Sequence, residues 1–592
     1  MTERRFRMSS DDHGLEALRH SASHILAQAV KRLYPEVKLG IGPSTDTGFY
    51  YDFDREISFV PEDLERIQEE MKNIVKENLP IEKKEVSRDE LRKLLEEQGE
   101  TYKLELLKEI PEGEIISVYT QGDFTDMCKG PHVTSTGQVR FFQLLSLAGA
   151  YWRGKETNPM LQRIYGTAFF DKKELKQYLL MLEEAKKRDH RKVGKELKIF
   201  TFEEQVGAGF PIWLPKGATL LGMIEEYDKK KHIEAGYQEI RTPHLGLVDL
   251  WKTSGHYYHY LDTMFPPMER DNQVFMVKPM NCPFHLTVYK NELRSYRELP
   301  IRYFEMANVY RYEKSGVLHG LLRVRSFEQD DAHVFCTPDQ LESELNNIRE
   351  FSIQLFKDFG FTDLHIFVSI RDQEHIDAGK YTGDPQQWDH IEKEFISIVE
   401  RMGIPYQIDP GEAKFYGPAI DIKVKDALGR LWQCTTIQVD FNLPKKFGLT
   451  YIGEDGAEHT PYMLHTATLG SMERFIAILL EQYAGNFPLW ISPLQVRIIP
   501  ISDEVLPYAR EICTVLRQHN LRAEVDENNE RMNAKIRKGE MEKIPYLLVV
   551  GKNEAESQTV SVRKRHRENL GSMSLDEIMK RMHQEIDEKT IF

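Results

Sequence analysis

The side-chain pattern between Phe304 and Phe335 predicts two strands joined by a glycine-containing loop. Arg311 and Glu313 share one face of the first strand. One face of the second strand carries a row of mixed chemistry: Arg323, Arg325, Phe327, Gln329, Asp331 and His333. The other face is not cleanly apolar, so this is no ordinary half-buried strand. We expect the hairpin to form the floor of a site for an anionic and planar ligand. A solvated antiparallel hairpin, which also alternates polar residues, is the competing interpretation.

Helical periodicity predicts the elements before this hairpin. Residues 15–35 form an amphipathic pattern that ends at a proline, with His20 and His24 one turn apart. Residues 171–200 combine leucines at helical spacing with many lysines and arginines, which indicates a helix that either faces solvent or touches phosphate. Residues 217–245 predict a helix, a glycine stop and a strand that ends at Thr242-Pro243.

The pattern after the hairpin predicts strands and then an apolar helix. Residues 413–426 and 429–444 alternate as two strands, with Gln433 and Gln438 near the middle. Residues 465–485 predict a loop that enters an apolar helix with Arg474 just inside its start. A buried arginine there is unfavourable unless an anion compensates it, whereas a surface arginine would need no ligand.

Length and segment patterns indicate several domains. A chain of 592 residues is too long for one core. From about residue 490, strands and helices alternate as in an α/β sheet. We predict an α+β multidomain protein with ranges 1–170, 171–194 (a linker helix), 195–489 and 490–592.

Composition restricts the classes of protein. Hydrophobic content of 41% and charged content of 29% are typical of globular proteins, and a net charge of -15 argues against a wholly basic surface. Nucleic acid would therefore bind at local basic patches. The scattered cysteines favour a reducing compartment over a disulfide framework; they are Cys128, Cys282, Cys336, Cys434 and Cys513. No apolar run has membrane-spanning length and no signal core precedes the first helix, so we expect a cytoplasmic protein without a membrane partner.

Two clusters of polar residues leave alternatives open. His20 and His24, with Cys128 and His132, have spacings that suit a four-ligand zinc site, but spacing alone favours two unrelated pairs, one helical and one in a loop. The basic run Arg563 to Arg567, with Lys535, Arg537 and Lys538, predicts either an RNA-binding patch or a solvated edge.

Several local patterns together resemble a known family. Thr242-Pro243, then Arg311-Tyr312-Glu313 with Phe327, then Gly470 to Arg474 match the three signatures of class II aminoacyl-tRNA synthetases in order. Seven patterns look like the threonyl-tRNA synthetase family: HSASH, DMCKGPH, MNCPFH, EQDDAH, FYGP, WQC and LGSMERF. The resemblance covers almost the whole chain.

Two departures from the family pattern limit what can be carried over. The segment before HSASH is too short for the small ubiquitin-like domain that many bacterial members carry at this end. Members often have lysine two residues after the glycine of FYGP, where this chain has Ala419. Any role of that lysine in substrate binding therefore cannot be assigned to position 419.

The resemblance implies a class II antiparallel sheet core that binds ATP with Mg²⁺. Arg311 would hold the α-phosphate, and Arg474 would contact the γ-phosphate and cover the adenine, with Phe327 stacked on the other side. Glu313 would read the adenine. The remaining residues implied around the nucleotide and the reacting groups are Arg323, Gln329, Gln433 and Thr436.

The resemblance also implies one Zn²⁺ per subunit, held by Cys282, His333 and His465 with open coordination for L-threonine. Zinc contacts to the amine and hydroxyl would reject valine, whereas serine lacks only a methyl, worth about 1–3 kcal/mol. Asp331 would orient the amine. Tyr416, Gln433 and Gln438 would complete the pocket for threonine and the adenylate.

Because serine would be activated too, the resemblance implies a second site that hydrolyses seryl-tRNA. This editing domain would occupy residues 1–170 and orient a water without a bound ion; its residues would be His20, His24, Lys103, Asp126, Cys128 and His132. The C-terminal α/β domain would bind the anticodon of tRNA(Thr) through Asn529, Arg537, Glu554 and Arg563. The family organisation also implies a homodimer.

Two other functions are compatible with parts of this pattern. An adenylate-forming ligase that does not charge tRNA would need neither the editing residues nor the C-terminal domain. A noncatalytic RNA-binding regulator would have no need for Arg311, Arg474 and three zinc ligands. We therefore expect a threonine–tRNA ligase with hydrolytic editing.

Overall fold

A computed structural model describes residues 10–155, 157–565 and 568–591, with the side chains of residues 10–13 left out. The chain divides between Glu183 and Glu184 into an N-terminal unit and a larger C-terminal unit. Each is described by itself. The four ranges inferred above remain predictions. In the described part of the chain, no helix combines the length and apolar character that a membrane span requires.

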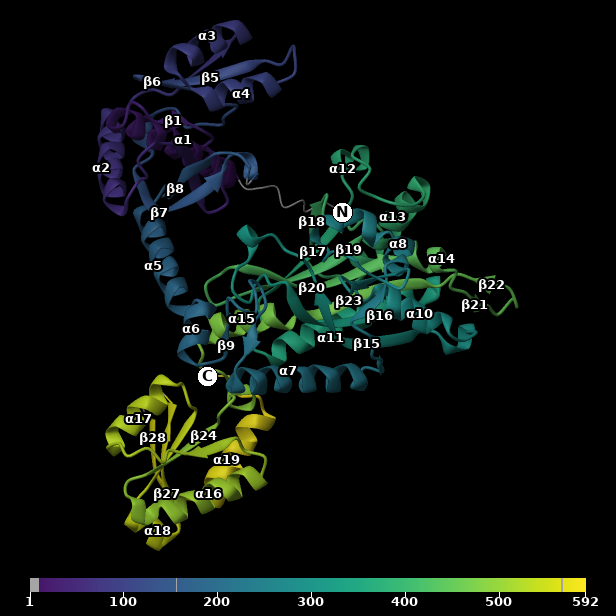
Figure 1. Cartoon of the computed structure of the whole chain (residues 1–592). Coiled ribbons are helices and arrows are strands. Elements are labelled where there is room, and N and C mark those ends of the chain that lie inside the picture. The colour runs from purple at the N-terminus through teal and green to yellow at the C-terminus, as the bar shows by residue number, and fades with distance from the viewer. Residues whose placement is uncertain (1–9, 156, 566–567, 592) are drawn as a thin grey trace. The chain divides into compact units, whose positions relative to one another are not determined.

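The N-terminal unit packs two long helices against an antiparallel sheet (Figure 1). The predicted helix at residues 15–35 is confirmed as part of α1, which buries Leu18, Ile25 and Leu26 against Phe49 and Ile164. The elements are α1 (Ser10–Leu33), β1 (Lys38–Leu39), β2 (Ser44–Thr45), β3 (Gly48–Asp54), α2 (Pro61–Glu77), β7 (Phe141–Tyr151) and β8 (Met160–Phe169).

A smaller three-stranded sheet completes this unit. Helix α3 begins with a capping box at Ser87 and ends at Gly99, whose φ of 72° is the left-handed conformation that glycine adopts without strain. Lys103 on α4 is buried. The elements are β4 (Glu82–Val86), α3 (Arg88–Gln98), α4 (Thr101–Glu109), β5 (Ile116–Gln121) and β6 (Phe124–Met127).

The segment predicted as one linker helix is interrupted. Helix α5 (Lys172–Arg188) ends before Asp189, and α6 (His190–Glu196) begins after it. The Asp189 carboxylate accepts a hydrogen bond from Arg191 N at 2.8 Å, which caps the new helix. Asp189 therefore starts a new helix within the lysine-rich run, which the leucine spacing alone did not indicate.

The centre of the C-terminal unit is an eight-stranded sheet in the order β11-β15-β16-β23-β20-β19-β17-β18. Neighbours are antiparallel except for the two edge pairs. In register, His333 of β16 lies opposite His465 of β23, which lies opposite Gln438 of β20. The strands are β11 (Gln238–Glu239), β15 (Ile301–Tyr310), β16 (Ser326–Cys336), β17 (Leu364–Ile370), β18 (Gln407–Pro410), β19 (Ala419–Lys425), β20 (Leu431–Asp440) and β23 (Tyr462–Ser471).

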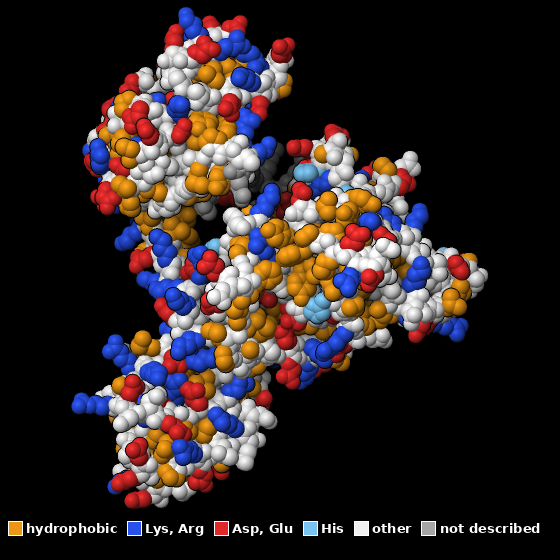
Figure 2. Space-filling view, viewed as in Figure 1, with side chains coloured by type: hydrophobic (Ala, Val, Ile, Leu, Met, Phe, Trp, Pro, Cys, Tyr) orange, Lys and Arg blue, Asp and Glu red, His pale blue; other side chains and the backbone are white. Residues whose placement is uncertain are grey.

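Helices cover this sheet and bury its apolar face. Leu345 and Ile348 of α11 pack with Val334, Ile437 and Leu464 of the strands. In the space-filling view, hydrophobic side chains also gather on the visible surface over the region of the sheet (Figure 2). The principal helices are α7 (Pro215–Glu234), α8 (Asp249–Ser254), α9 (His256–His259), α10 (Cys282–Lys290), α11 (Leu341–Asp358), α12 (Gln373–Asp377), α13 (Pro385–Arg401), α14 (Leu443–Phe447) and α15 (Met472–Tyr483).

The remaining short strands of the C-terminal unit form small separate sheets. One three-stranded sheet has the order β12-β14-β13 and leaves Leu245, Leu247 and Met268 exposed. The short strands are β9 (Phe200–Thr201), β10 (Ile212–Trp213), β12 (Leu245–Leu247), β13 (Met268–Arg270), β14 (Gln273–Val277), β21 (Tyr451–Ile452) and β22 (Glu458–His459).

Three sequence-based expectations about the strands are wrong in detail. The residues from His465 to Ser471 form the end of central strand β23, because their backbone pairs with β16 and β20 on both sides. Arg323 and Arg325 precede β16, since Arg325 N bonds to Gly209 O outside the hairpin. The strand predicted to end at Thr242-Pro243 ends at Glu239.

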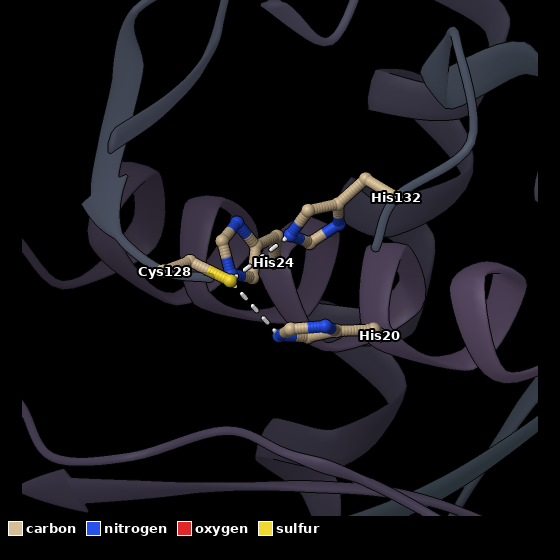
Figure 3. Close-up of side chains that lie close together, drawn as sticks. All are labelled: His20, His24, Cys128 and His132. Atoms are coloured by element: carbon tan, nitrogen blue, oxygen red, sulfur yellow. Dashed lines mark hydrogen bonds between the residues drawn. The ribbon is translucent and has the colours of Figure 1, made fainter. Parts of the chain in front are cut away.

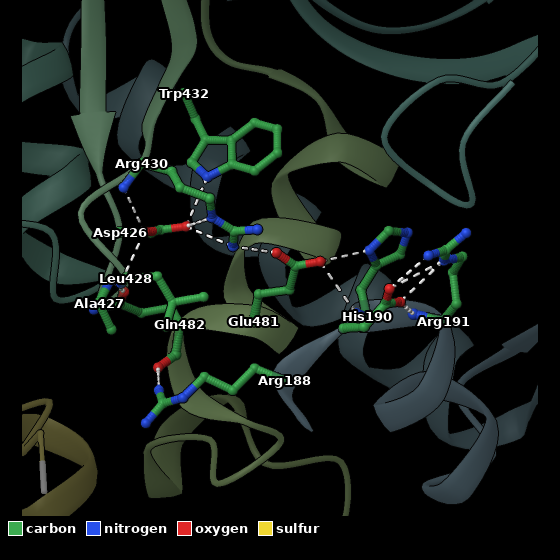
Figure 4. A network of polar contacts seen from close by, with 11 residues as sticks. Arg188, His190, Arg191, Asp426, Ala427, Leu428, Arg430, Trp432, Glu481 and Gln482 are labelled. Atoms are coloured by element: carbon green, nitrogen blue, oxygen red, sulfur yellow. Dashed lines mark hydrogen bonds and ion pairs between the residues drawn. The ribbon is translucent and has the colours of Figure 1, made fainter. Parts of the chain in front are cut away.

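A buried ion network anchors α6 to the loop before β16 (Figure 4). Glu481 of α15 lies 2.7 Å from His190 Nδ1, and His190 Nε2 accepts a hydrogen bond from Leu321 N at 3.1 Å. The acceptor role of Nε2 places the imidazole proton on Nδ1. Glu481 also pairs with Arg430, which bonds to Asp426 at 2.7 Å. The network therefore fixes the loop before β16 at Leu321. The following residue, Leu322, lines a cavity.

The C-terminal segment is the predicted α/β sheet, with strand order β25-β24-β26-β27-β28. Its first three strands are parallel and the last two join antiparallel. The elements are β24 (Val496–Pro500), α16 (Leu506–Gln518), β25 (Ala523–Val525), α17 (Met532–Met541), β26 (Tyr546–Val550), α18 (Lys552–Ser557), β27 (Thr559–Lys564), β28 (Glu568–Ser574) and α19 (Leu575–Asp587).

Candidate functional site

Two adjoining cavities, of about 450 and 440 Å³, lie on one face of strands β16, β20 and β23. They share part of their lining, so a ligand longer than either cavity can extend through both. The shared residues are Arg311, Glu313, Arg323, Gln329, Lys414, Thr436, Gln438 and Ala467. The first cavity adds Phe327, Gln433 and Arg474, and the second adds Cys282, Asp331, Tyr416 and His465.

The first cavity is strongly cationic and has an aromatic wall. The Arg311 guanidinium lies 5.2 Å from the centre of the Phe327 ring and donates to Pro279 O at 3.3 Å. Burial lowers the pKa of Arg311, which shows how little water solvates its charge. Arg323 Nε bonds to Glu313 Oε2 at 3.0 Å. Such a cavity suits a ligand with phosphates and a planar base.

Arg474 is exposed rather than buried, which favours the surface alternative that the sequence left open. Its side chain reaches the first cavity and donates from Nε to Leu322 O at 3.3 Å. The short turn before it is held by Asp330, which accepts hydrogen bonds from Leu469 N at 2.7 Å and Gly470 N at 2.8 Å. Gly470, with φ of 77°, makes the bend into α15.

Arg325, which was predicted to share the row of site residues, does not line either cavity. Its guanidinium donates to Glu313 O at 2.9 Å and lies 4.5 Å from the centre of the Tyr312 ring. The backbone leaves strand geometry before Ser326, so alternation no longer sets the direction of this side chain. Arg325 is therefore a structural support for the loop.

Polar residues of β20 and of the turn before β19 line the cavities, and Asp421 of β19 supports them. Asp421 accepts from Gln433 Nε2 at 2.6 Å and from Thr436 Oγ1 at 2.7 Å. Tyr416 hydrogen-bonds to Gln438 through its hydroxyl. These contacts hold the amide and hydroxyl groups in place before any ligand binds.

A potential metal site lies at the inner end of the second cavity. Cys282, His333 and His465 are buried, and their ligand atoms lie within 4.8 Å of one another. One sulfur and two imidazole nitrogens are a donor set that zinc prefers. His333 Nε2 and His465 Nδ1 face each other at 3.0 Å. These residues therefore fit a zinc ion by both chemistry and convergence.

The neighbours of the two histidines favour the tautomers that a metal needs. His465 Nε2 lies 2.9 Å from Asp440 Oδ2, which places its proton there and leaves Nδ1 as a ligand atom. His333 Nδ1 lies 2.8 Å from His285 Nδ1, and His285 Nε2 lies 3.3 Å from Glu305. When His333 Nδ1 donates to His285, Nε2 is left as the ligand atom. Burial also lowers the pKa of His333, which favours the neutral ring.

The N-terminal unit holds a second cluster of potential ligands (Figure 3). His20 and His24 come from α1, whereas Cys128 and His132 come from the loop after β6. Cys128 Sγ lies 3.2 Å from both His20 Nε2 and His132 Nε2. All four ligand atoms lie within 4.8 Å of one another, so the two pairs suggested by the sequence form one cluster.

The electrostatics of this cluster favour neutral groups. Burial raises the pKa of Cys128 to about 11 and lowers the pKa of both His24 and His132 well below the usual range. The sulfur is therefore a thiol at neutral pH, and the imidazoles can accept protons or hold water. Ser21 Oγ forms a 3.1 Å hydrogen bond with His132 Nδ1, which fixes the orientation of that ring.

A buried ion pair borders the cluster. Lys103 Nζ lies 2.8 Å from Asp126 Oδ1, and Tyr51 donates to Asp126 Oδ2 at 2.6 Å. His24 Nε2 is 3.9 Å from the same carboxylate. The structure thus brings Lys103 and Asp126 to the cluster, although α4 and β6 are distant in sequence from α1, which carries His20 and His24.

The residues predicted to read the anticodon are dispersed over the C-terminal sheet. Asn529 and Arg537 are exposed, and Glu554 caps α18 by accepting from Gly551 N at 2.9 Å. Arg563 lines a cavity of about 260 Å³ together with Lys543, Lys564 and Arg565.

The predicted basic patch is only partly confirmed as a surface. Lys535 of α17 is buried, and its amine donates to Asp526 O at 2.9 Å and to Pro500 O at 3.4 Å. Lys564 pairs with Glu585 at 2.7 Å. His566 and Arg567 lie outside the described residues.

Several residues that shape the sites escaped sequence reasoning. Their roles are identified only by contacts across the fold: Ser21, Tyr51, Glu305, Asp330, Lys414, Asp421 and Asp440. Ser21, Asp330 and His285 did offer a signal, since they lie within the HSASH, EQDDAH and MNCPFH patterns.

Three family models match separate parts of the chain. A tRNA synthetase class II core domain (G, H, P, S and T) matches residues 266–483, and an anticodon binding domain matches residues 495–585. The model of the threonyl and alanyl tRNA synthetase second additional domain matches residues 116–165. These matches confirm the predicted multidomain fold with a class II core.

The chain is also similar to curated proteins and solved structures. A threonine–tRNA ligase of Sulfurihydrogenibium sp. (strain YO3AOP1) is 51% identical over 99% of this chain and 91% of its own length. One from Aquifex aeolicus (strain VF5) is 50% identical over 97% of this chain and 90% of its own. The solved RNA binding domain of threonyl-tRNA synthetase from Cryptosporidium parvum Iowa II is 36% identical, with a TM-score of 0.63, over 67% of this chain and 98% of that one.

Proposed function

The chain belongs to the threonyl-tRNA synthetase family, and from this premise we propose how its sites divide the work of a threonine–tRNA ligase with editing. The enzyme activates L-threonine with ATP, transfers it to tRNA(Thr) and hydrolyses mischarged seryl-tRNA(Thr). The observation that carries the division is the continuity of a cationic cavity with a second cavity that ends at Cys282 and His465. A nucleotide in the first cavity thereby meets an amino acid in the second.

ATP occupies the cationic cavity in this proposal. Phe327 and Arg474 enclose the adenine, Glu313 reads its edge, and Arg311 holds the α-phosphate where charge develops during attack by the threonine carboxylate. Arg323, Gln329, Gln433 and Thr436 complete the contacts. Mg²⁺ accompanies the phosphates. The cation–aromatic packing of Arg311 on Phe327 supports this arrangement, because it preorganises both groups.

Threonine occupies the second cavity, where Cys282, His333 and His465 would hold one zinc ion per subunit. When bound there, zinc supplies a Lewis acid for the amine and hydroxyl of the amino acid. Asp331 orients the amine, and Tyr416 with Gln438 closes the pocket. Because valine lacks the hydroxyl, it loses a polar contact that serine retains.

The cluster of His20, His24, Cys128 and His132, with Lys103 and Asp126, hydrolyses seryl-tRNA in this proposal. Burial keeps the imidazoles neutral, so they can accept hydrogen bonds from a water and orient it, and the Lys103 ammonium beside Asp126 supplies positive charge at the site. The cluster orients a water without a bound ion. Hydrolysis is required because one missing methyl gives limited discrimination in the first step.

His132→Ala is expected to lower seryl-tRNA(Thr) hydrolysis about 100-fold, since misplacing the attacking water has an effect on this scale. Threonine-dependent charging should stay within about twofold, because the cluster lies in the other unit of the chain. Single-turnover deacylation of seryl-tRNA measures the first quantity. Gln68→Ala is the matched control, because Gln68 bonds to Gln143 away from the cluster. Wild-type hydrolysis in His132→Ala would contradict the assignment.

The C-terminal domain binds the anticodon through Asn529, Arg537, Glu554 and Arg563 in this proposal. Arg563 is supported by its position in a cavity rich in cations, and Asn529 and Arg537 by their exposure. Nucleotide phosphates and bases are attracted to such a surface.

We further propose a cytoplasmic homodimer. Leu245, Leu247 and Met268 lie on strands β12 and β13, which flank β14 in one small sheet, and 46%, 43% and 45% of their surfaces are exposed. An exposed apolar stripe on a sheet is typical of an interface, and two-fold dimers are the commonest assembly. Analytical ultracentrifugation of the purified chain measures this state.

A further inference from the structure

Lys414 is a lysine that lines both cavities, and no role in the proposed reaction has been assigned to it. Its side chain is half-buried. Within the described chain, the amine has no hydrogen-bond or ion-pair partner. A half-buried ammonium without a partner is unfavourable unless an anion arrives to compensate it.

The backbone holds Lys414 in a fixed turn. Lys414 N donates to Gly417 O at 3.2 Å, and Gly417 N donates to Lys414 O at 3.3 Å. The turn is pressed against β20, because a Cβ at Gly417 would lie 1.7 Å from Val439 O. Tyr416, in the same turn, bonds to Gln438 of that strand. The lysine therefore starts from a rigid base rather than from a mobile loop.

The charge distribution indicates what the amine binds. The lining shared by the two cavities contains Arg311, Arg323 and Lys414 as cations. Arg323 is paired with Glu313 at 3.0 Å, so Arg311 and Lys414 remain for an anion. In an aminoacyl adenylate the phosphate joins the nucleotide to the amino acid. A ligand that extends through both cavities thus has its phosphate beside their shared lining.

We propose that Lys414 is a catalytic residue that binds the α-phosphate during threonine activation, together with Arg311. This inference rests on the proposed function. A carboxylate oxygen of threonine forms a bond to the α-phosphorus, and the bond from that phosphorus to the bridging oxygen of the β-phosphate breaks. Pyrophosphate leaves with the electron pair, and no proton is transferred. The ammonium of Lys414 stabilises the charge on the α-phosphate oxygens as this exchange occurs.

Position 419 offers a matched location for the same charge. Ala419 of β19 lies directly opposite Gln438, and directly opposed residues share a face of the sheet. Gln438 lines both cavities, so a long side chain at 419 would start on the cavity face. Ala419 itself is buried and carries no charge. Moving the lysine from position 414 to position 419 therefore tests whether the reaction requires the positive charge itself or the conformation of the turn around Lys414.

Lys414→Met is expected to lower kcat/KM of threonine-dependent ATP–pyrophosphate exchange about 100-fold, the scale seen when one preorganised charge contact is removed. The affinity for adenosine, which lacks phosphate, should stay within about twofold. The double variant Lys414→Met with Ala419→Lys should recover at least tenfold of the loss. Unchanged adenosine affinity and an unchanged melting temperature serve as the check that the C-terminal unit, which contains both positions, is folded in each variant.

The outcomes distinguish a failure of the proposed role of Lys414 from a failure of the proposed function. Exchange within threefold of wild type in Lys414→Met would overturn the role of Lys414. Equal losses of ATP and adenosine affinity, with a lowered melting temperature and no rescue by Ala419→Lys, would also overturn it, because they indicate a structural role. Absence of threonine-dependent exchange in the wild-type enzyme would instead overturn the proposed assignment of the two cavities.

Discussion

Arg311→Ala is expected to lower kcat/KM of threonine-dependent ATP–pyrophosphate exchange by about 10³-fold, equivalent to about 4 kcal/mol of transition-state stabilisation. The guanidinium packs on the Phe327 ring and lines both cavities, and its burial there lowers its pKa by desolvation. Electrostatic stabilisation in such a site is stronger than in water. Pyrophosphate exchange at saturating threonine measures the effect.

Arg311→Lys separates the charge of this residue from its geometry. Lysine retains the charge but lacks the planar fork that can bind two phosphate oxygens and stack on Phe327, so only a small part of the lost activity should return. Arg325→Ala is the matched control, because Arg325 comes from the same hairpin but does not line either cavity. Equal losses in Arg311→Ala and Arg325→Ala would contradict the specific role of Arg311.

Cys282→Ser is expected to reduce zinc content below about one tenth of an equivalent per subunit and to abolish threonine activation. Serine is a far weaker zinc ligand than a thiolate, and two imidazoles alone do not retain the ion. Burial raises the pKa of the Cys282 thiol well above its usual value, so without a cation the thiolate is unfavourable. Metal analysis after dialysis measures the content.

A second variant tests the support of the same site without removing a ligand. Asp440→Asn should weaken zinc binding about 10- to 100-fold, because Asp440 fixes the tautomer and orientation of His465. Added zinc should then restore threonine activation in Asp440→Asn but not in Cys282→Ser. Full zinc content with normal threonine activation in Cys282→Ser would show that the metal assignment is wrong.

The sequence predicts those parts of the fold that local patterns determine. Helix α1 follows from the spacing of Leu18, Ile25 and Leu26, and strand β16 follows from alternation between Phe327 and His333. The prediction failed where tertiary pairing replaces local preference. The residues from His465 to Ser471 were predicted as a loop. They form part of β23, because their backbone pairs with β16 and β20. Alternation also failed at Arg325, because the chain is not yet extended there.

The candidate sites show the same division. Cys282, His333 and His465 are distant in sequence, so only the family resemblance grouped them. In the structure, the sheet register places His333 opposite His465, and Cys282 lies close to both. Asp440 and Asp330 carry no recognisable spacing, because their roles depend on strands that become neighbours only after folding. Lys414 is found only when the lining of the cavities is known.

The most direct test of the account is ATP–pyrophosphate exchange by the wild-type enzyme with threonine, serine or valine, before and after zinc removal by a chelator. The zinc-loaded enzyme should activate threonine and serine but reject valine by about 10⁴-fold, since the site binds the hydroxyl. The chelated enzyme should activate none of them until zinc is returned. Undiminished threonine activation by metal-free enzyme, or equal activation of valine by the loaded enzyme, would contradict the proposal that zinc selects the amino acid.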